Sequence, residues 1–145
     1  MLPTLKSSLA FFLAYTLVMV TAVYTLRLPQ HLTGQPALVD EYYVHRRLFS
    51  FGLDLVFIVL YWGFAYTVWN VAGIQQTWAQ GLVLLGTTAF LTAFFWWSFT
   101  RQPLNPDRFF SRWFHAVGAY SILYDVILLG LIFIVFHAIR SVLGD

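Results

Sequence analysis

Four apolar segments, each long enough to cross a lipid bilayer, constrain this chain more than any other feature. They cover residues 9–26, 48–69, 79–99 and 113–139, and a spanning helix needs roughly 17–25 residues. Only 10% of the chain is charged, against about 25% in a soluble domain. The alternating pattern of a barrel strand is absent, so helices must satisfy the backbone within lipid. The sequence predicts an all-α, polytopic membrane protein, a four-transmembrane-helix bundle forming a single integral membrane domain over residues 1–145.

The distribution of arginine predicts the orientation of this bundle. Cationic residues concentrate in the segments that join the first helix to the second and the third to the fourth. These arginines are Arg27, Arg46, Arg47, Arg101, Arg108 and Arg112. The positive-inside rule places both segments in the cytoplasm and both termini on the non-cytoplasmic side, in the plasma (inner) membrane. We therefore attribute the net charge of +2 to the cytoplasmic arginines that set the topology, and we expect no nucleic-acid partner.

Aromatic side chains near the helix ends predict two interfacial belts. Rings that are apolar with one polar tip suit the boundary between lipid and water. The residues assigned to the belts are Tyr61, Trp62, Tyr66, Trp69 and Trp78 on one side, and Tyr42, Tyr43, Trp96, Trp97 and Trp113 on the other. We expect them to anchor the helices rather than to form a pigment or cofactor site.

Two aspartates fall inside the apolar segments and are the main candidates for function. Asp54 is expected roughly 9 Å inside the cytoplasmic boundary, and Asp125 near the bilayer midplane, at 1.5 Å of rise per residue. An ionisable group in hydrocarbon is costly, so each is a candidate ion- or proton-binding residue. The alternatives stay open: Asp54 as a polar clamp between helices, and Asp125 in a structural hydrogen bond.

Four further residues are candidates for gating or for pairing with the aspartates. Arg47 lies two helical turns before Asp54 and is expected at the cytoplasmic entrance. Ser121 shares a helix face with Asp125, and Thr88 and Thr92 share a face of the third helix. Hydroxyl and carboxylate oxygens suit a hard cation such as Na⁺, although threonine in a membrane helix more often serves packing or bonds its own backbone.

The sequence gives little reason to expect catalysis, a cofactor or a bound metal. It contains no cysteine, which excludes disulfides and thiolate ligands, and it has no HExxH motif. His45 and His115 could meet at the cytoplasmic boundary, but an interfacial histidine needs no ligand. A lipid-modifying enzyme would combine His115 with Asp125, ten residues apart and about 15 Å along a helix, which disfavours direct cooperation.

The segment RRLFSFGLD, from Arg46 to Asp54, resembles the opening of a membrane helix in the RDD family of membrane proteins. In that family an arginine begins a membrane helix and an aspartate follows about two turns later. The resemblance assigns these positions to Arg47 and Asp54, and Asp125 could stand for a second family aspartate. It implies a role in ion or solute transport.

Two functions remain from these observations. The first is cation- or proton-coupled transport that uses the membrane-embedded aspartates, in which case a homo-oligomer is expected because four helices rarely enclose a pathway alone. The second is an accessory or assembly subunit, in which the aspartates pair with partner membrane subunits. The lipid bilayer is the expected surrounding in both.

Overall fold

The computed structural model describes residues 5–144, and within that range it contains helices and no strand. Four of the helices are long and apolar enough to cross a membrane: Leu5–Thr25, Arg47–Ala72, Thr77–Thr100 and Tyr120–Leu143. This confirms the predicted all-α bundle and indicates an integral membrane protein. Short helices that cannot span occupy the connections between the first and second and between the third and fourth of these helices.

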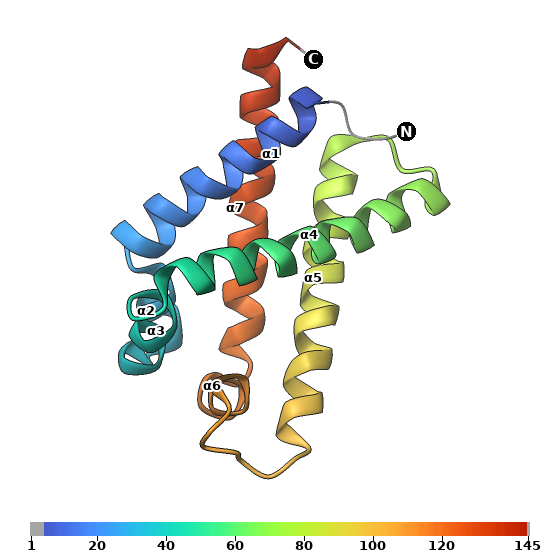
Figure 1. Cartoon of the computed structure of the whole chain (residues 1–145). Coiled ribbons are helices and arrows are strands. Elements are labelled where there is room, and N and C mark those ends of the chain that lie inside the picture. Colours follow the sequence, from blue (N-terminus) through green and yellow to red (C-terminus); the bar gives the residue numbers. More distant parts are fainter. Residues whose placement is uncertain (1–4, 145) are drawn as a thin grey trace.

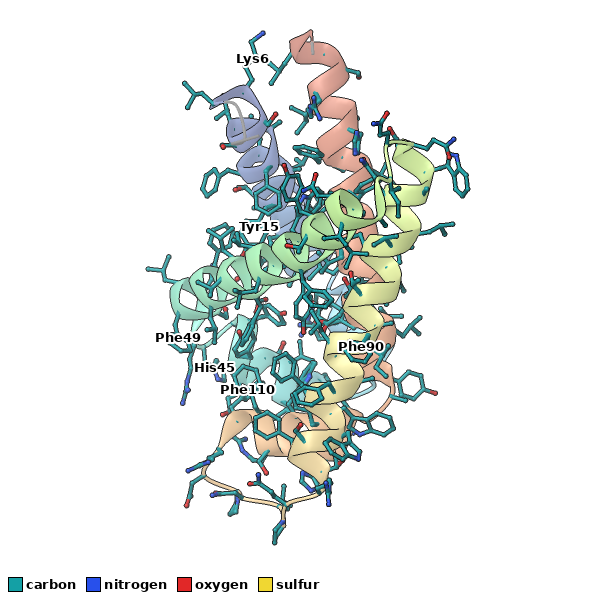
Figure 2. All side chains as sticks on the ribbon, turned by 90° about the vertical axis from the view of Figure 1, so that its right-hand side faces the viewer. Lys6, Tyr15, His45, Phe49, Phe90 and Phe110 are labelled. Carbon is teal, nitrogen blue, oxygen red and sulfur yellow. The ribbon has the colours of Figure 1, made fainter. Side chains whose placement is uncertain are left out.

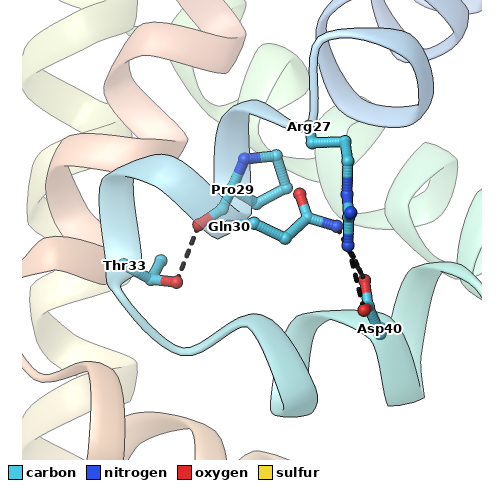
Figure 3. Close-up of polar contacts among 5 residues, drawn as sticks. All are labelled: Arg27, Pro29, Gln30, Thr33 and Asp40. Atoms are coloured by element: carbon cyan, nitrogen blue, oxygen red, sulfur yellow. Dashed lines mark hydrogen bonds and ion pairs between the residues drawn. The ribbon is translucent and has the colours of Figure 1, made fainter.

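The first spanning helix consists of α1 (Leu5–Val18) and a π-helical continuation, η1 (Met19–Thr25). It ends at Thr25, and Arg27, two residues later, is the one non-glycine residue of the described part with a left-handed backbone, at φ 52°. The guanidinium of Arg27 donates to both carboxylate oxygens of Asp40, at 2.9 and 3.0 Å (Figure 3). This contact ties the end of the first span to the short helices that follow it.

Two short helices, α2 (Leu28–Thr33) and α3 (Pro36–Tyr43), connect the first span to the second. Each begins with a proline at its first or second position, where the missing N–H costs no helical hydrogen bond. Gly34 separates them with φ 63°, a conformation that glycine adopts without strain. The resulting bend places α2 and α3 together at one end of the molecule (Figure 1).

The second and third spans form a helical hairpin of α4 (Arg47–Ala72) and α5 (Thr77–Thr100), whose axes cross obliquely (Figure 1). Gly73 ends α4 in the left-handed conformation, with φ 65°. The indole N–H of Trp69 donates to the carbonyl of Gln80 at 3.0 Å across the turn. The hairpin turn is therefore held by a side chain as well as by its backbone.

The predicted fourth span, residues 113–139, is interrupted in the structure. Residues Phe109–Val117 form a separate helix, α6, and the spanning helix α7 covers Tyr120–Leu143. Gly118 lies between them with φ 58° and ψ −135°, a backbone conformation essentially confined to glycine. Gly118 therefore permits a sharp change of direction within the apolar segment.

Helix α7 lies between α1 on one side and α5 on the other, while α4 runs obliquely across the bundle (Figures 1 and 2). The helices α5 and α7 approach closely at two glycines. A Cβ at Gly81 would lie 3.1 Å from the ring of Phe133, and one at Gly130 would lie 3.4 Å from Leu85. Small residues of this kind let membrane helices pack at short distance.

The two ends of the molecule differ in the elements that they carry. The start of α1 and the end of α7 lie at one end, and α2, α3 and α6 lie at the other (Figure 1). Figure 2 shows Lys6 at the first of these ends, and His45 and Phe110 toward the second. The two arginine-rich connections therefore share one end of the bundle, as the four-span topology requires.

The prediction of aromatic belts holds for only part of the set. Trp78 and Trp97 are 68% and 53% exposed within the isolated chain, as expected for interfacial anchors. In contrast, several rings of the predicted belts are buried inside the protein. The buried members are Tyr42, Tyr43, Tyr61, Trp69 and Trp113. Their sequence positions suggested a membrane interface, but tertiary packing directs them inward.

Candidate functional site

A cavity of about 220 Å³ lies inside the bundle, toward the end that carries α3 and α6. Residues from α3, α4, α5, α6 and α7 line it, and most of them carry aromatic rings. Asp54 and Asp125 are the two charged residues among them. The aromatic residues of the wall are Tyr42, Tyr43, Phe57, Tyr61, Phe95, Phe99, Phe109, Phe110, Trp113, Phe114 and Tyr124. The fold thus brings both predicted site residues to one cavity.

Both carboxylate oxygens of Asp54 accept hydrogen bonds from tyrosines of α3. The hydroxyl of Tyr42 donates to Oδ1 and that of Tyr43 to Oδ2, each at 2.7 Å. The Tyr43 hydroxyl also lies 2.9 Å from that of Tyr124 on α7. Burial raises the pKa of Tyr42 and of Tyr43, so both phenols keep the protons that they donate. Asp54 is therefore the centre of a network that joins α3, α4 and α7.

Asp125 has fewer partners than Asp54. Its Oδ2 accepts one hydrogen bond, from Thr92 Oγ1 of α5 at 2.6 Å. The hydroxyl of Tyr61 lies 3.3 Å from the same Thr92 oxygen. Within residues 5–144 no hydrogen bond reaches Oδ1. One carboxylate oxygen of this cavity-lining residue thus has no hydrogen-bond partner in the part of the chain that the structure describes.

No positively charged side chain balances these two carboxylates in the part of the chain that the structure describes. The ion pairs found there involve other acids, namely Arg27 with Asp40 and Arg112 with Glu41. A pair of acidic side chains in an aromatic cavity has a strong tendency to bind a proton or a cation, because an uncompensated charge in a low-dielectric site is costly.

An ion pair joins the two short helices that border the cavity. Arg112 of α6 donates two hydrogen bonds to the carboxylate of Glu41 on α3, both at 2.6 Å. The rings of Tyr42 and Phe109 stack beside it, with centroids 4.8 Å apart. The hydrogen bonds from Arg112 lower the pKa of Glu41, so the acid remains charged at neutral pH. Helices α3 and α6 are thus linked next to the residues that line the cavity.

The start of α7 changes the position of Asp125 along its helix from that expected for a span beginning at residue 113. Because α7 begins at Tyr120, Asp125 lies five residues into it, about 8 Å along the axis. Asp54 lies seven residues into α4, about 10 Å from its start. Both aspartates are therefore near the same end of the bundle, and Asp125 is not near the middle of its helix.

Of the four residues expected to gate or pair, one contacts an aspartate. Thr92 binds Asp125, as described above. Arg47 is exposed at the start of α4, with its guanidinium 5.8 Å from the ring of Tyr24, and forms no ion pair with Asp54. Ser121 donates to the carbonyl of Gly118 at 2.7 Å. Thr88 is buried, and its hydroxyl has no hydrogen-bond partner in the described residues.

The tyrosines around the aspartates are the functional candidates that sequence reasoning missed. Tyr42 and Tyr43 lie on α3, away from the helices that carry the aspartates, so no helical period relates these two to Asp54 or Asp125. Tyr61 lies two turns after Asp54 on α4, and Tyr124 directly precedes Asp125 on α7. The available signal is the acidic pair that directly precedes Tyr42 and Tyr43 in the sequence. An amphipathic helix over this segment, as observed for α3, directs the two tyrosines inward.

The histidines do not assemble into a ligand site. His115 Nδ1 lies 2.8 Å from the backbone carbonyl of Ser111, within its own helix. Among residues 5–144 no three His, Cys, Asp or Glu side chains come together to hold a metal. Asp54 and Asp125 are therefore the acidic groups of this cavity on which a chemical role can be built.

Comparison with known proteins identifies no relative: no family model, no curated protein and no solved structure matches this chain. The resemblance to the RDD family stays a prediction from residues 46–54.

Proposed function

We propose that this chain is a small membrane transporter coupled to a cation or a proton, with Asp125 as the binding group. The observation that carries the proposal is the cavity in which two aspartates meet without a basic partner in the described residues. Within residues 5–144, one oxygen of Asp125 accepts no hydrogen bond, and Asp54 lines the same cavity with both of its oxygens bonded to tyrosines. Carboxylate and hydroxyl oxygens are the ligands that hard cations prefer, and a carboxylate is also a proton carrier.

The shared position of the start of α1 and the end of α7 supports a matching topology. We propose that the end bearing α2, α3 and α6 faces the cytoplasm, because the arginine-rich connections are there, and that both termini are on the opposite side. The RDD resemblance implies transport of ions or solutes and so points the same way. In this orientation the cavity is near the cytoplasmic face, and substrate would reach it past α3 and α6.

A flux assay with the purified protein in lipid vesicles tests the proposal. Asp125→Asn removes the titratable group and keeps the size of the side chain, so it should abolish cation- or pH-dependent flux. Asp107→Asn, in the exposed connection between α5 and α6, is the matched control and should retain it. Asp125→Glu keeps the charge and should retain partial flux, which separates loss of function from misfolding. Unchanged flux in Asp125→Asn would refute the proposal.

The second candidate function, a subunit of a larger membrane complex, is favoured by the large exposed surface of α5. Of its 24 residues only Leu84, Thr88 and Thr92 are buried within the chain. Purification through an affinity tag in mild detergent distinguishes the two. A stoichiometric unrelated membrane protein would support the subunit role, and a homo-oligomer would support the transporter.

A further inference from the structure

The walls of the cavity differ from those of a site for a bare metal cation. A hard cation such as Ca²⁺ takes six to eight oxygen ligands, and most of this wall is aromatic carbon. Aromatic faces attract cations through the ring quadrupole, and a group of such rings is the usual site for quaternary ammonium. The wall therefore favours a cation that carries its own apolar groups.

In this wall, rings from α3, α4 and α5 surround the ring of Phe110 on α6. The ring of Phe110 on α6 lies 5.9 Å from that of Phe57 on α4, 6.3 Å from Phe99 on α5 and 6.1 Å from Tyr42 on α3. Rings at these separations form an aromatic cluster. Phe110 is the member that contacts all the others, so it is the best position at which to test the contribution of the rings.

The carboxylate of Asp125 is the negative charge that a bound cation would meet, and its hydrogen bond from Thr92 orients it. Asp54 uses both oxygens to accept from Tyr42 and Tyr43, whereas Oδ1 of Asp125 has no partner in the described residues. A carboxylate oxygen without a donor beside aromatic rings is the arrangement that an ammonium group would complete. Asp125 thus supplies the charge and the rings supply the remaining surface.

The volume of the cavity limits the size of the ligand. A cavity of about 150 Å³ holds a benzene molecule, and drug-sized ligands occupy about 300–1,000 Å³. At about 220 Å³ the cavity has room for a small molecule with a few carbon atoms around one charge. A peptide or a whole phospholipid would not fit.

From these observations we infer that the cavity binds a small organic ammonium ion, with Asp125 as its counter-ion and Phe110 in its aromatic wall. This inference rests on the proposed transport function and adds the chemical class of the cation. The ammonium inference can be tested separately from the transport proposal, because a proton or sodium ion could use the same aspartates without needing the rings.

Calorimetric titration of the purified full-length protein with choline provides the first test. The neutral analogue 3,3-dimethylbutan-1-ol has nearly the same shape, with carbon in place of the charged nitrogen. We expect saturable binding of choline, binding of the analogue at least tenfold weaker, and no competition from sodium. Equal binding of the two compounds would mean an apolar cavity without charge selection and would overturn the inference, as would the absence of choline binding.

Substitutions then assign the binding to the two named residues. Asp125→Asn should weaken choline binding at least tenfold and leave the neutral analogue unaffected. Phe110→Leu keeps an apolar side chain and removes the ring, and should weaken choline binding about tenfold, whereas Phe110→Tyr should retain it. Phe90→Leu is the matched control, since Phe90 lies on the outside of α5 with 64% of its surface exposed (Figure 2). Unaltered affinity in Phe110→Leu would overturn the aromatic assignment.

The two proposals fail in different experiments. If vesicles show cation- or pH-dependent flux that needs Asp125, but the protein does not bind choline, the ammonium inference is wrong and the transport proposal stands. If choline binds with the expected selectivity while flux is unchanged in Asp125→Asn, the transport proposal is wrong and the binding site stands. Retention of secondary structure and of the elution volume shows that each variant folds.

Discussion

The two aspartates of the cavity lie in contrasting surroundings. Asp54 accepts hydrogen bonds at both oxygens from Tyr42 and Tyr43, and through Tyr43 it is connected to α7. Asp125 accepts one, from Thr92. The cost of placing a carboxylate in an apolar interior falls with each hydrogen bond that it receives. Asp54 is therefore suited to hold structure, and Asp125 to exchange partners.

The two aspartates also differ in the helices from which they receive hydrogen bonds. The donors to Asp54 come from α3, a short helix outside the four spanning segments. The donor to Asp125 comes from α5, a spanning helix that already packs against α7. Loss of Asp54 would release a helix that borders the cavity, whereas loss of Asp125 would leave the helix packing intact. One cavity thus combines a structural acid and an acid free to bind.

The largest expected effect comes from removing the two carboxylates in turn. Asp54→Ala leaves two buried tyrosine hydroxyls without their acceptor and should lower the free energy of unfolding by about 3 kcal/mol. Asp125→Ala should cost about 1 kcal/mol, since Thr92 keeps Tyr61 as a neighbour. Unfolding by dodecyl sulfate in mixed micelles measures both. Equal losses, or a larger loss at Asp125, would contradict the division of roles.

The tyrosines around Asp54 should differ in a similar way. Tyr43 shares its hydroxyl between Asp54 and Tyr124, and Tyr42 has Asp54 alone. We expect Tyr43→Phe to lower the free energy of unfolding by about 2 kcal/mol and Tyr42→Phe by about 1 kcal/mol. The same micelle titration applies, with Tyr120→Phe as a control at the exposed start of α7. A smaller effect at Tyr43 than at Tyr42 would mean that its bond to Tyr124 adds nothing.

The single donor to Asp125 should matter more for flux than for stability. Thr92→Val has the same shape but no hydroxyl, and should lower the free energy of unfolding by about 1 kcal/mol or less. It should reduce flux in vesicles severalfold, because the carboxylate loses the group that orients it. Thr87→Val is the control, since Thr87 bonds the carbonyl of Val83 in its own helix at 2.8 Å. If both variants transport equally, Thr92 does not position Asp125.

The spans could be predicted from the sequence because their signal is local. A run of apolar residues long enough to cross a bilayer is visible without any knowledge of its neighbours, and all four such helices exist. The break at Gly118 was missed for the opposite reason. Aromatic and small residues on both sides continue the apolar run, and only the backbone conformation, with φ 58°, separates α6 from α7.

The two acidic residues of the candidate site could be predicted from the sequence, but the side chains that surround them could not. Asp54 and Asp125 stand out because charge is rare in hydrocarbon. Their partners are set by tertiary packing, since Tyr43 and Tyr124 are 81 residues apart in the chain and belong to helices of different character. The expectation of a gating role for Arg47 came from spacing along one helix, but the helix start places that side chain in an exposed position.

The smallest expected effect concerns the ion pair that links α3 to α6. Hydrogen bonds from Arg112 lower the pKa of Glu41 from its ordinary 4.5, so the pair stabilises the fold above that value. The contribution is lost as pH falls through the lowered pKa of the folded state. Arg112→Lys keeps the charge but loses the two-pronged geometry, so the pKa of Glu41 should rise toward 4.5. Carboxyl-carbon NMR across an acid titration measures this shift.

The size of the stability change in Arg112→Lys bears on how α3 is held. Exposed ion pairs contribute about 0–1 kcal/mol, and both side chains of this pair are 30% exposed, so we expect a loss below 1 kcal/mol. Arg27→Lys, at the other ion pair of α3, should have a loss no greater than that. If Arg112→Lys instead destabilises the protein as much as Asp54→Ala, then the ion pair, rather than the buried carboxylate, keeps Tyr42 and Tyr43 in the cavity wall.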